Sequence, residues 1–332
     1  MEHQIHRIGV LTSGGDAPGM NAAVRAVVRT AMDCGIECVG IRRGWNGLIN
    51  SDFVQLDASS VSHIIDKGGT VLYTARSEEF MTEPGRAKAL STCKLLGLDG
   101  IVAIGGDGTF RGALALSRQA ASSGYGSLRV VGIPATIDND IGCSHYTIGF
   151  DTACNTAVEC IDKLRDTMQS HERCSVVEVM GRHAGYLALY VGVAVGATAV
   201  LVPEHQYDFE KHVAEKIRAA RLGGKTNFMI VVAEGAASAM DVGKEIKEHL
   251  GLDPRVTILG HIQRGGSPTA KDRVLATRMG YEAVRVLAEG MTNRVICVRD
   301  DQIVNVDIDE GLAMKKTLNA EEFEVMTVMT GV

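Results

Sequence analysis

The chain has 332 residues, of which 45% are hydrophobic and 22% are charged, as in an ordinary soluble globular protein. This length is sufficient for two domains, each with its own core. The formal net charge of −6 argues against bulk attraction to nucleic acid or to an anionic membrane surface. An anionic ligand would need local arginines, helix N-termini or a metal ion.

The cysteines and the apolar segments exclude further classes of protein. The eight cysteines are scattered and form no Cys-x-x-Cys pair, which argues against a zinc site and favours reduced, mostly buried thiols in a reducing cytosol. No apolar stretch follows a basic start at the N-terminus, so no secretory signal is predicted. Residues 187–202 are uncharged but too few to span a membrane, and we expect a buried helix followed by a buried strand.

In the first half of the chain, short apolar segments alternate with Gly-rich turns and helical patterns. The expected order is strand 8–12, helix from about 20 to 32, strand 39–42, strand 101–104, helix from about 110 to 121 and strand 130–134. Continuously apolar strands that alternate with helices are typical of a parallel sheet covered on both faces. In such sheets, ligands bind at the carboxyl ends of the strands.

The second half repeats this pattern. The expected order is helix 152–166, strand 175–180, helix 209–222 and strand 228–233, followed by an apolar segment at 256–259. Gly223 and Gly224 are expected to end the helix that precedes them. We therefore predict an α/β fold with mostly parallel sheets.

Two Gly-rich turns that follow predicted strands have the composition of phosphate-binding turns. Ser13–Asn21 follows the first strand and reaches the start of a helix, and Gly105–Gly108 follows a later strand. Glycines let the backbone approach a phosphate and direct N–H groups at it, and Asp107 can bind Mg²⁺. A side chain at Gly106 or Gly108 would occupy the space that the phosphate needs. The alternative is a pair of tight turns in which Asp107 caps a helix.

Residues Thr136–Asp140 place two carboxylates, Asp138 and Asp140, two positions apart. In an extended segment these side chains share a face. One carboxylate would accept a proton from an attacking hydroxyl and the other would hold a metal ion, as phosphoryl transfer requires. The alternative is a surface turn stabilised by an Asp or Asn side chain.

Several polar residues near turns or strand ends complete the set of candidates. The arginines among them are Arg76, Arg173, Arg182, Arg255 and Arg264. A guanidinium group donates two parallel hydrogen bonds to a phosphate. A lone arginine is more often a solvated surface charge, but several beside Gly-rich turns favour phosphate binding. For Glu234 and His261, a contact to a sugar and a structural role remain open.

Five stretches, in the same order, resemble the bacterial-type ATP-dependent 6-phosphofructokinases from Ile8 to about Asp309. They are Gly9–Asn21, Gly105–Gly108, Pro134–Asp140, Ser175–Arg182 and Leu259–Pro268. The resemblance implies a glycolytic enzyme that moves the γ-phosphate of ATP to the 1-hydroxyl of fructose 6-phosphate, giving fructose 1,6-bisphosphate and ADP. It also implies two doubly wound, three-layer α/β domains.

The resemblance implies domain borders and an assembly. Residues 1–149 and about 263–313 would form a larger nucleotide-binding domain, and residues about 150–262 and 314–332 a smaller sugar-phosphate-binding domain. The enzyme would be an allosteric cytoplasmic homotetramer, with no nucleic-acid or membrane partner. Each complete site would then need two chains.

The resemblance assigns roles to individual residues. Asp138 would be the base that accepts the 1-hydroxyl proton, with Thr136 and Arg182 as the other catalytic residues, and Asp107 and Asp140 would hold Mg²⁺. The residues expected around the nucleotide and the transferred phosphoryl group are Gly15, Arg76, Gly106, Asp107, Gly108 and Thr109. The residues expected to bind fructose 6-phosphate are Thr136, Asp138, Arg173, Met180, Gly181, Arg182, Glu234, Arg255, His261 and Arg264. Arg173 and Arg255 would grip the 6-phosphate across a subunit interface.

The phosphate donor is inferred from two positions. Pyrophosphate-dependent relatives commonly carry Asp at the position of Gly108 and Lys at the position of Ala135, so Gly108 favours ATP. ATP-type relatives usually have Gly where this chain has Ala135, and a pyrophosphate-dependent kinase of the same fold is the alternative. Trp45 matches an aromatic residue near adenine, and stacking on adenine and packing in the core are both open.

Regulation is inferred from the residues that match the family's effector site. The basic matches are Arg25, Arg29, Arg165 and Lys225, whereas Ala58 and Gly223 replace basic residues. Each charge-assisted hydrogen bond contributes about 1.5–3 kcal/mol. The loss of two cations therefore predicts weak or altered control by ADP or phosphoenolpyruvate.

Two functions of other kinds are alternatives to this one. A kinase for NAD or a lipid would share the Gly-Gly-Asp-Gly turn, but Thr136–Asp140 and His261–Arg264 argue against it. A catalytically silent nucleotide sensor would be expected to lack a catalytic carboxylate, yet Asp107, Asp138 and Asp140 are all present.

Overall fold

The computed structural model describes residues 5–126 and 128–330. These residues form two compact units. The first unit contains the described residues up to Thr136, together with Ile141–Gly149 and Gly266–Lys316, and the second contains Ile137–Asp140, Phe150–Gly265 and the described residues from Thr317 onward. The expectation of no secretory signal concerns the N-terminus, and residues 1–4 lie outside the described part.

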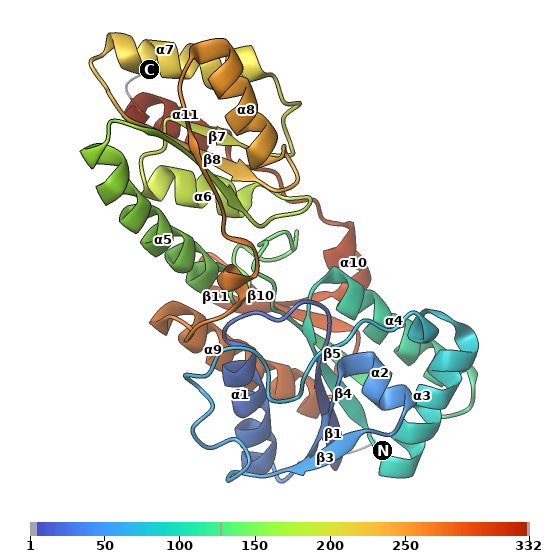
Figure 1. The fold of residues 1–332 in the computed structure, drawn as a ribbon. Coiled ribbons are helices and arrows are strands. Elements are labelled where there is room, and N and C mark those ends of the chain that lie inside the picture. The colour runs from blue at the N-terminus through green and yellow to red at the C-terminus, as the bar shows by residue number, and fades with distance from the viewer. Residues whose placement is uncertain (1–4, 127, 331–332) are drawn as a thin grey trace. The chain divides into compact units, whose positions relative to one another are not determined.

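The first unit is built on a seven-stranded sheet with the order β11-β10-β5-β4-β1-β2-β3 (Figure 1). The strands are β1 (Arg7–Thr12), β2 (Glu37–Ile41), β3 (Phe53–Leu56), β4 (Gly100–Gly105), β5 (Arg129–Pro134), β10 (Arg294–Arg299) and β11 (Gln302–Asp307). The five strands from β10 to β2 are parallel, whereas β3 and β11 pair antiparallel at the two edges. The carboxyl ends of β1, β4 and β5 therefore meet at one edge of the sheet.

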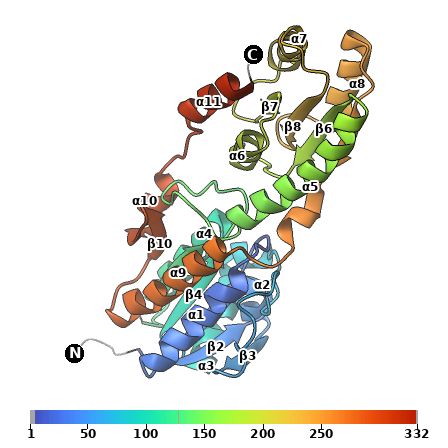
Figure 2. The ribbon, with the colours of Figure 1, turned by 90° about the vertical axis from the view of Figure 1, so that its left-hand side faces the viewer.

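Helices cover both faces of this sheet. On one face, α1 (Met20–Asp33) and α9 (Ala270–Ala288) lie side by side (Figure 2). The other helical elements of this unit are α2 (Gly44–Ile49), η1 (Glu79–Met81), α3 (Glu83–Leu96), α4 (Asp107–Ser122) and α10 (Ile308–Ala313). One buried apolar cluster joins α2, α3 and α4 to alternate residues of the strands, such as Leu11, Ile101 and Val130. This alternation is what a strand buried on both faces requires.

The second unit is built on four parallel strands with the order β7-β8-β6-β9. The strands are β6 (Cys174–Val179), β7 (Ala199–Leu201), β8 (Phe228–Ala233) and β9 (Arg255–Ile258). The helical elements are α5 (Phe150–Ser170), α6 (Tyr186–Ala194), the π-helical turn η2 (Glu210–Ala214), α7 (Glu215–Leu222), α8 (Ala239–Leu250), η3 (Gly260–Arg264) and α11 (Ala320–Thr330). A buried cluster joins β6, β7 and β8 to α7 and α8. The predicted α/β fold with two doubly wound, mostly parallel sheets is confirmed.

The predicted segments agree with the structure in most places, and three helices differ from the prediction. The helix expected over 152–166 is longer in the structure, where α5 spans Phe150–Ser170. Residues 187–202 form α6 apart from its first residue and then β7, as expected, and no described helix is long and apolar enough to cross a membrane. Helix α7 ends at Gly223–Gly224, where Gly224 has a φ of 86°. The helix expected from about Phe110 begins at Asp107, and the helix expected over 209–222 opens with a π-helical turn. Asp107 therefore lies at a helix N-terminus, where its charge is favourable.

Candidate active site

The two Gly-rich turns of the first unit are in direct contact. One follows β1, and the other joins β4 to α4. The Thr109 hydroxyl donates to the Ser13 carbonyl oxygen at 3.1 Å, and the Ser13 N–H donates to the Ile104 carbonyl oxygen at 3.0 Å. Because β1 and β4 are parallel neighbours, both turns lie at the same edge of the sheet. Thr109 is buried, so this hydrogen bond joins the two turns on their protein side and not on their exposed side.

The glycines of the second turn have two different roles. A Cβ atom at Gly105 would lie 2.3 Å from the Ser13 carbonyl oxygen, so the packing of the two turns requires this glycine. At Gly106 and Gly108, an added Cβ would meet no described atom within 4 Å beyond its chain neighbours. These two positions leave open space at the start of α4, where the first N–H groups of a helix lack intrahelical acceptors. A phosphate group fits such a place.

The segment that leads to Arg76 is attached to the first Gly-rich turn. The Thr74 hydroxyl donates to the Gly14 carbonyl oxygen at 2.7 Å, and the Thr12 hydroxyl donates to the Tyr73 carbonyl oxygen at 2.8 Å. Arg76 itself is exposed. The structure thus places the predicted nucleotide-binding residues in one region of the first unit: Gly15, Arg76, Gly106, Asp107, Gly108 and Thr109.

Trp45 packs in the core of the first unit. It is 5% exposed, and its ring stacks on Phe80 with centroids 4.6 Å apart and an interplanar angle of 11°. A Cβ atom at Gly112 would lie 2.8 Å from the Trp45 Nε1 atom. Of the two interpretations of Trp45, the structure supports core packing and not stacking on adenine.

Asp138 is half-buried in the second unit, and its surroundings raise its pKa to about 6. Burial is the largest cause, the negative charges of Asp140 and Glu234 add to it, and Arg264 and His183 act in the opposite direction. A carboxylate with this pKa is ionised at neutral pH and accepts a proton more readily than an ordinary aspartate. These are the properties of a general base.

The segment that carries Asp138 and Asp140 is not extended, and that expectation is wrong. Asn139 has a φ of 52° and is buried, so the chain turns between the two carboxylates. Asp138 is half-buried and Asp140 is exposed, although the charge of Asp140 still acts on Asp138. Thr136, just before this turn, belongs to the first unit, where its carbonyl oxygen accepts from the Thr147 hydroxyl at 2.6 Å.

Most predicted sugar-phosphate residues lie at the carboxyl ends of β6, β8 and β9. The Glu234 N–H donates to the Val179 carbonyl oxygen at 2.9 Å, which joins the ends of β8 and β6. A Cβ atom at Gly235 would lie 2.0 Å from the Arg182 carbonyl oxygen, so these two turns are in contact. Because the strands are parallel, the structure brings one group together at this edge: Met180, Gly181, Arg182, Glu234, His261 and Arg264.

Arg173 and Arg255 lie at the opposite edge of the same sheet. Arg173 precedes β6, and Arg255 is the first residue of β9. The parallel register places Ser175 beside Arg255, so both arginines lie at the amino ends of their strands. Both are exposed, and Arg255 pairs with Asp253 at 3.4 Å. Within one chain, the structure does not bring these two arginines to the other sugar-phosphate residues.

Sequence reasoning missed Gln263 and His183. Gln263 is fully buried, and its Oε1 atom accepts the Met180 N–H at 2.9 Å, which links the turn after β6 to η3. Its Nε2 atom has no hydrogen-bond partner within the part of the chain that the structure describes. An uncharged polar residue between His261 and Arg264 gives little signal on its own, because burial is not visible in the sequence.

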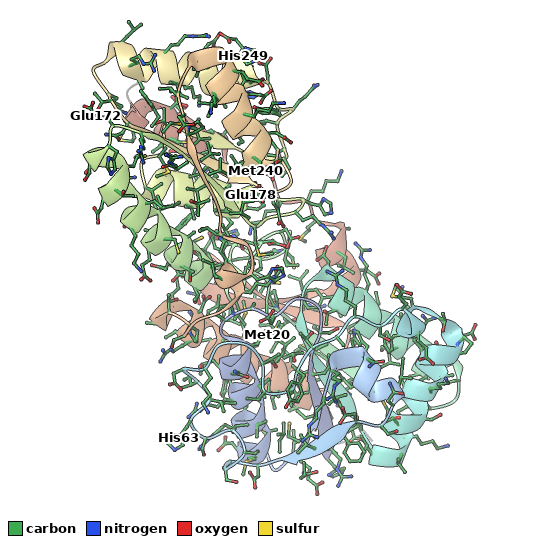
Figure 3. All side chains as sticks on the ribbon, in the orientation of Figure 1. Met20, His63, Glu172, Glu178, Met240 and His249 are labelled. Atoms are coloured by element: carbon green, nitrogen blue, oxygen red, sulfur yellow. The ribbon has the colours of Figure 1, made fainter. Side chains whose placement is uncertain are left out.

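Glu178 is a carboxylate in a strand that is otherwise largely apolar, and its hydrogen bond explains its presence there. It belongs to β6 and lies beside the N-terminal end of α8, the helix that carries Met240 (Figure 3). The Ala239 N–H donates to the Glu178 Oε2 atom at 3.0 Å. A negative charge at a helix N-terminus is stabilising, so this residue positions α8 on the sheet.

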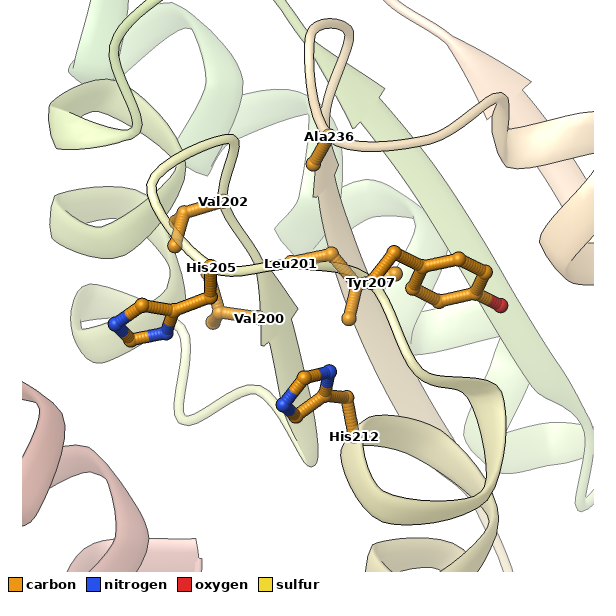
Figure 4. Close-up of a pocket in the computed structure, with 7 residues that line it drawn as sticks. All are labelled: Val200, Leu201, Val202, His205, Tyr207, His212 and Ala236. Carbon is orange, nitrogen blue, oxygen red and sulfur yellow. The ribbon is translucent and has the colours of Figure 1, made fainter.

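Two cavities are lined by other residues than the predicted site residues, although Ala236, which lines one of them, follows the turn at Glu234 and Gly235. A cavity of about 20 Å³ in the second unit is lined by residues that include His205, Tyr207 and His212 (Figure 4), and it has room for about one water molecule. A recess of about 270 Å³ in the first unit is lined by residues that include Lys271 and Arg278. None of the residues that line either is a predicted site residue. The candidate site therefore consists of the strand-end turns.

Comparison with known proteins gives one consistent family. The family model described as "Phosphofructokinase" matches residues 7–287. The chain is 51% identical over 323 residues to an ATP-dependent 6-phosphofructokinase of Clostridium botulinum, covering 97% of this chain and 99% of the relative. It is 52% identical over 324 residues to an ATP-dependent 6-phosphofructokinase of a Thermoanaerobacter species, with the same coverage.

A solved structure supports the same conclusion at the level of the fold. The phosphofructokinase of Saccharomyces cerevisiae superposes with a TM-score of 0.89 at 35% sequence identity. The match covers 98% of this chain but 48% of the yeast chain, so this chain spans about half the length of that relative.

Proposed function

The chain belongs to the phosphofructokinase family, and on that basis we propose that it transfers the γ-phosphate of ATP to the 1-hydroxyl of fructose 6-phosphate. The products are fructose 1,6-bisphosphate and ADP, and the reaction is a step of glycolysis. One observation carries the proposal. Asp138, with a pKa raised to about 6, belongs to the same unit as the other predicted sugar-phosphate residues except Thr136.

The two units take different substrates in this proposal. The first unit binds ATP at its two Gly-rich turns, and the second binds fructose 6-phosphate at the carboxyl ends of β6, β8 and β9. Ligands of parallel α/β sheets bind at this edge, which supports the assignment.

ATP is the donor because of Gly108. The space beside this residue is open, and an aspartate there would bring a negative charge close to the α-phosphate. Ala135, the second informative position, is 1% exposed, and its N–H donates to the Gly105 carbonyl oxygen at 2.9 Å. The Ala135 methyl group is covered by protein, so it does not reduce the space for the donor. The relatives at 51% and 52% identity are named ATP-dependent, which favours ATP over pyrophosphate.

Asp107 and Asp140 each have the chemistry of a magnesium ligand. Mg²⁺ usually takes one or two protein carboxylates and completes its shell with substrate phosphates and water. Asp107 starts α4 beside the open space of Gly106 and Gly108, and Asp140 is exposed. When bound, the ion would offset the negative charge of the phosphate oxygens.

The chain's own residues account for the rest of the reaction. Asp138 accepts the proton of the sugar 1-hydroxyl as that oxygen attacks. Thr136 and Arg182, with Gly15 and Arg76, contact the transferred phosphoryl group and favour the charge that it carries in the transition state. Met180, Gly181, Glu234, His261 and Arg264 hold the sugar phosphate in a fixed orientation, which lowers the entropic part of the barrier.

The 6-phosphate is bound across a subunit interface in this proposal. Arg173 and Arg255 lie at the amino ends of β6 and β9, away from the other sugar-phosphate residues of the same chain. They therefore act on the site of a second chain, and the enzyme is a homotetramer. We place it in the cytoplasm, in line with its free cysteines.

An assay with each donor in turn tests the proposed function. Fructose 6-phosphate and Mg²⁺ are supplied with either ATP or pyrophosphate, and fructose 1,6-bisphosphate is measured through aldolase. We expect product with ATP alone. Product with pyrophosphate alone would make the chain the pyrophosphate-dependent kinase, and product with neither would remove the proposal.

Replacing Arg255 by alanine is expected to raise the KM for fructose 6-phosphate by about 10- to 100-fold, since a charge-assisted hydrogen bond contributes about 1.5–3 kcal/mol. The contact exists before and during phosphoryl transfer, so kcat changes little. Steady-state kinetics with each substrate varied measure both constants. Arg218→Ala is the matched control, because Arg218 is an exposed arginine of the same unit paired with Glu210. An unchanged KM in Arg255→Ala would contradict the role of Arg255.

Control by ADP or phosphoenolpyruvate is expected to be weak. The Arg29 side chain donates to the Ala58 carbonyl oxygen at 3.4 Å, and Gly223 caps the end of α7. Neither Ala58 nor Gly223 offers a cation to a phosphate. Saturation curves for fructose 6-phosphate with and without each effector should nearly coincide, and strong activation by ADP would refute this expectation.

A further inference from the structure

Cys143 and Cys297 are in contact although 154 positions separate them in the sequence. The Cys297 thiol donates to the Cys143 sulfur at an Sγ–Sγ distance of 3.3 Å. Both residues are buried, and both are free thiols. The proposed phosphoryl transfer uses neither of them. Two thiols held this close are a candidate site of covalent modification.

The backbone around the pair keeps the two sulfurs adjacent. Cys297 lies in β10, and Cys143 lies in a segment that runs beside this strand. The Val298 N–H donates to the Ser144 hydroxyl oxygen at 3.0 Å, and the Arg299 Nε atom donates to the Cys143 carbonyl oxygen at 2.9 Å. The residues next to both thiols are thus fixed to each other. The two sulfurs are therefore close enough for a disulfide bond to form through a local shift of the two segments.

We propose that Cys143 and Cys297 are a redox modification site, at which hydrogen peroxide forms a disulfide within the chain. The Cys143 thiolate attacks one peroxide oxygen, the O–O bond breaks, and the leaving hydroxide takes up a proton to become water. The Cys297 sulfur then attacks the sulfenic acid of Cys143, the S–S bond forms, and a second water leaves. Both sulfurs are oxidised and both peroxide oxygens are reduced.

The surroundings of the two thiols set the order of these steps. The hydrogen bond from Cys297 lowers the pKa of the Cys143 thiol, and Arg299 acts in the same direction, whereas burial and the charge of Asp107 oppose this shift without reversing it. The hydrogen bond to Cys143, together with burial, raises the pKa of Cys297. Cys143 therefore loses its proton first and is the attacking nucleophile.

Burial selects the oxidant. Cys143 is 2% exposed and Cys297 is 0% exposed, so a molecule as small as hydrogen peroxide reaches them far more readily than a bulky disulfide such as oxidised glutathione. Cys34, at the end of α1, is exposed and should react with both reagents. Cys34 therefore serves as the control for whether each oxidant can reach a cysteine of this chain.

The disulfide would also affect the reaction of the enzyme, and this part of the inference rests on the proposed function. Bond formation shortens the distance between the sulfurs from 3.3 Å to about 2.05 Å. Cys143 comes three positions after Asp140 in the chain, so the shift pulls on the segment that follows the catalytic turn. Displacements of about 1 Å can cost up to 10²-fold in rate, and we expect kcat to fall about tenfold.

The test treats the reduced full chain with hydrogen peroxide, counts free thiols after denaturation and maps peptides without reduction. We expect a peptide that links Cys143 to Cys297, a mass loss of about 2 Da per link and a fall in kcat that dithiothreitol reverses. Oxidised glutathione should modify Cys34 and leave the pair reduced. Cys143→Ser and Cys297→Ser should each abolish the link, whereas Cys34→Ser should retain it.

Two results would overturn the inference. One is oxidation of Cys34 by peroxide while Cys143 and Cys297 remain thiols, and the other is conversion of Cys143 to a sulfinic acid with no link to Cys297. Both are read in the wild-type chain, so they do not depend on the folding of the variants. A link with unchanged kcat would overturn the effect on catalysis. Failure to phosphorylate fructose 6-phosphate at all would remove the proposed function and leave the disulfide result in place.

Discussion

Replacing Asp138 by asparagine is expected to lower kcat by about 10²–10⁴-fold, because the side chain then cannot accept the hydroxyl proton. The KM values for ATP and fructose 6-phosphate should change little, since asparagine has nearly the same shape. Steady-state kinetics at pH 8 measure the effect. Turnover within a few-fold of the wild type would contradict the role of Asp138 as the base.

The stability of the same variant is the control for its folding. A carboxyl group whose pKa is raised on folding binds its proton more tightly in the folded state, so its ionisation destabilises the protein. The rise from 3.8 to about 6 corresponds to about 2–3 kcal/mol above pH 6. Asp138→Asn should therefore resist urea better than the wild type at pH 8, and this gain should vanish as the pH falls toward 4. A variant less stable at pH 8 would mean that lost activity reflects folding.

Replacing Gly108 by aspartate is expected to raise the KM for ATP by about 10- to 100-fold. Like charges a few ångströms apart near a protein surface repel by about 4 kcal/mol at most, and solvent lowers this figure. The added Cβ meets no described atom within 4 Å. Gly108 is also the second residue of α4, where a negative charge favours the helix. The variant should therefore be as stable as the wild type, with an unchanged KM for fructose 6-phosphate.

Gly105→Ala is the matched control for this prediction. Its Cβ would lie 2.3 Å from the Ser13 carbonyl oxygen, so this variant should lose stability before it loses ATP affinity. The two variants are thus expected to differ in the property that changes: Gly105→Ala loses stability, and Gly108→Asp loses affinity for ATP. An unchanged KM for ATP in Gly108→Asp would mean that the donor does not lie beside the start of α4.

The sequence could predict the elements whose signal is local. β4, β5 and β8 are continuous apolar runs that end in Gly, Pro or Glu-Gly, and their bounds lie within one residue of the prediction. Most of residues 43–99 and 267–332 could not be assigned from local sequence patterns, although the structure places α3 and α9 there. Helix α9 has a mixed sequence, and contact with α1, far away in the chain, decides its buried face.

The sequence could predict which residues belong to the candidate site, but not the backbone conformation or the contacts that position them. The motifs gave the carboxylates and arginines, because their residue types and spacing reflect chemistry. The left-handed conformation of Asn139 was not foreseen, since asparagine is compatible with both extended and left-handed backbone. Nor could the sequence separate Gly105 from Gly106, because the difference is a contact with Ser13, more than ninety positions away. The role of Gln263 depends on burial, which only the folded chain defines.

A crystal structure of the chain with fructose 6-phosphate and a non-hydrolysable ATP analogue is the most direct test of the central claim. The account predicts that the sugar 1-hydroxyl oxygen lies within about 2.6–3.2 Å of an Asp138 carboxylate oxygen, with the phosphate chain of the analogue beside Gly106 and Gly108. Ligands bound away from Asp138, or a phosphate chain remote from the start of α4, would contradict it.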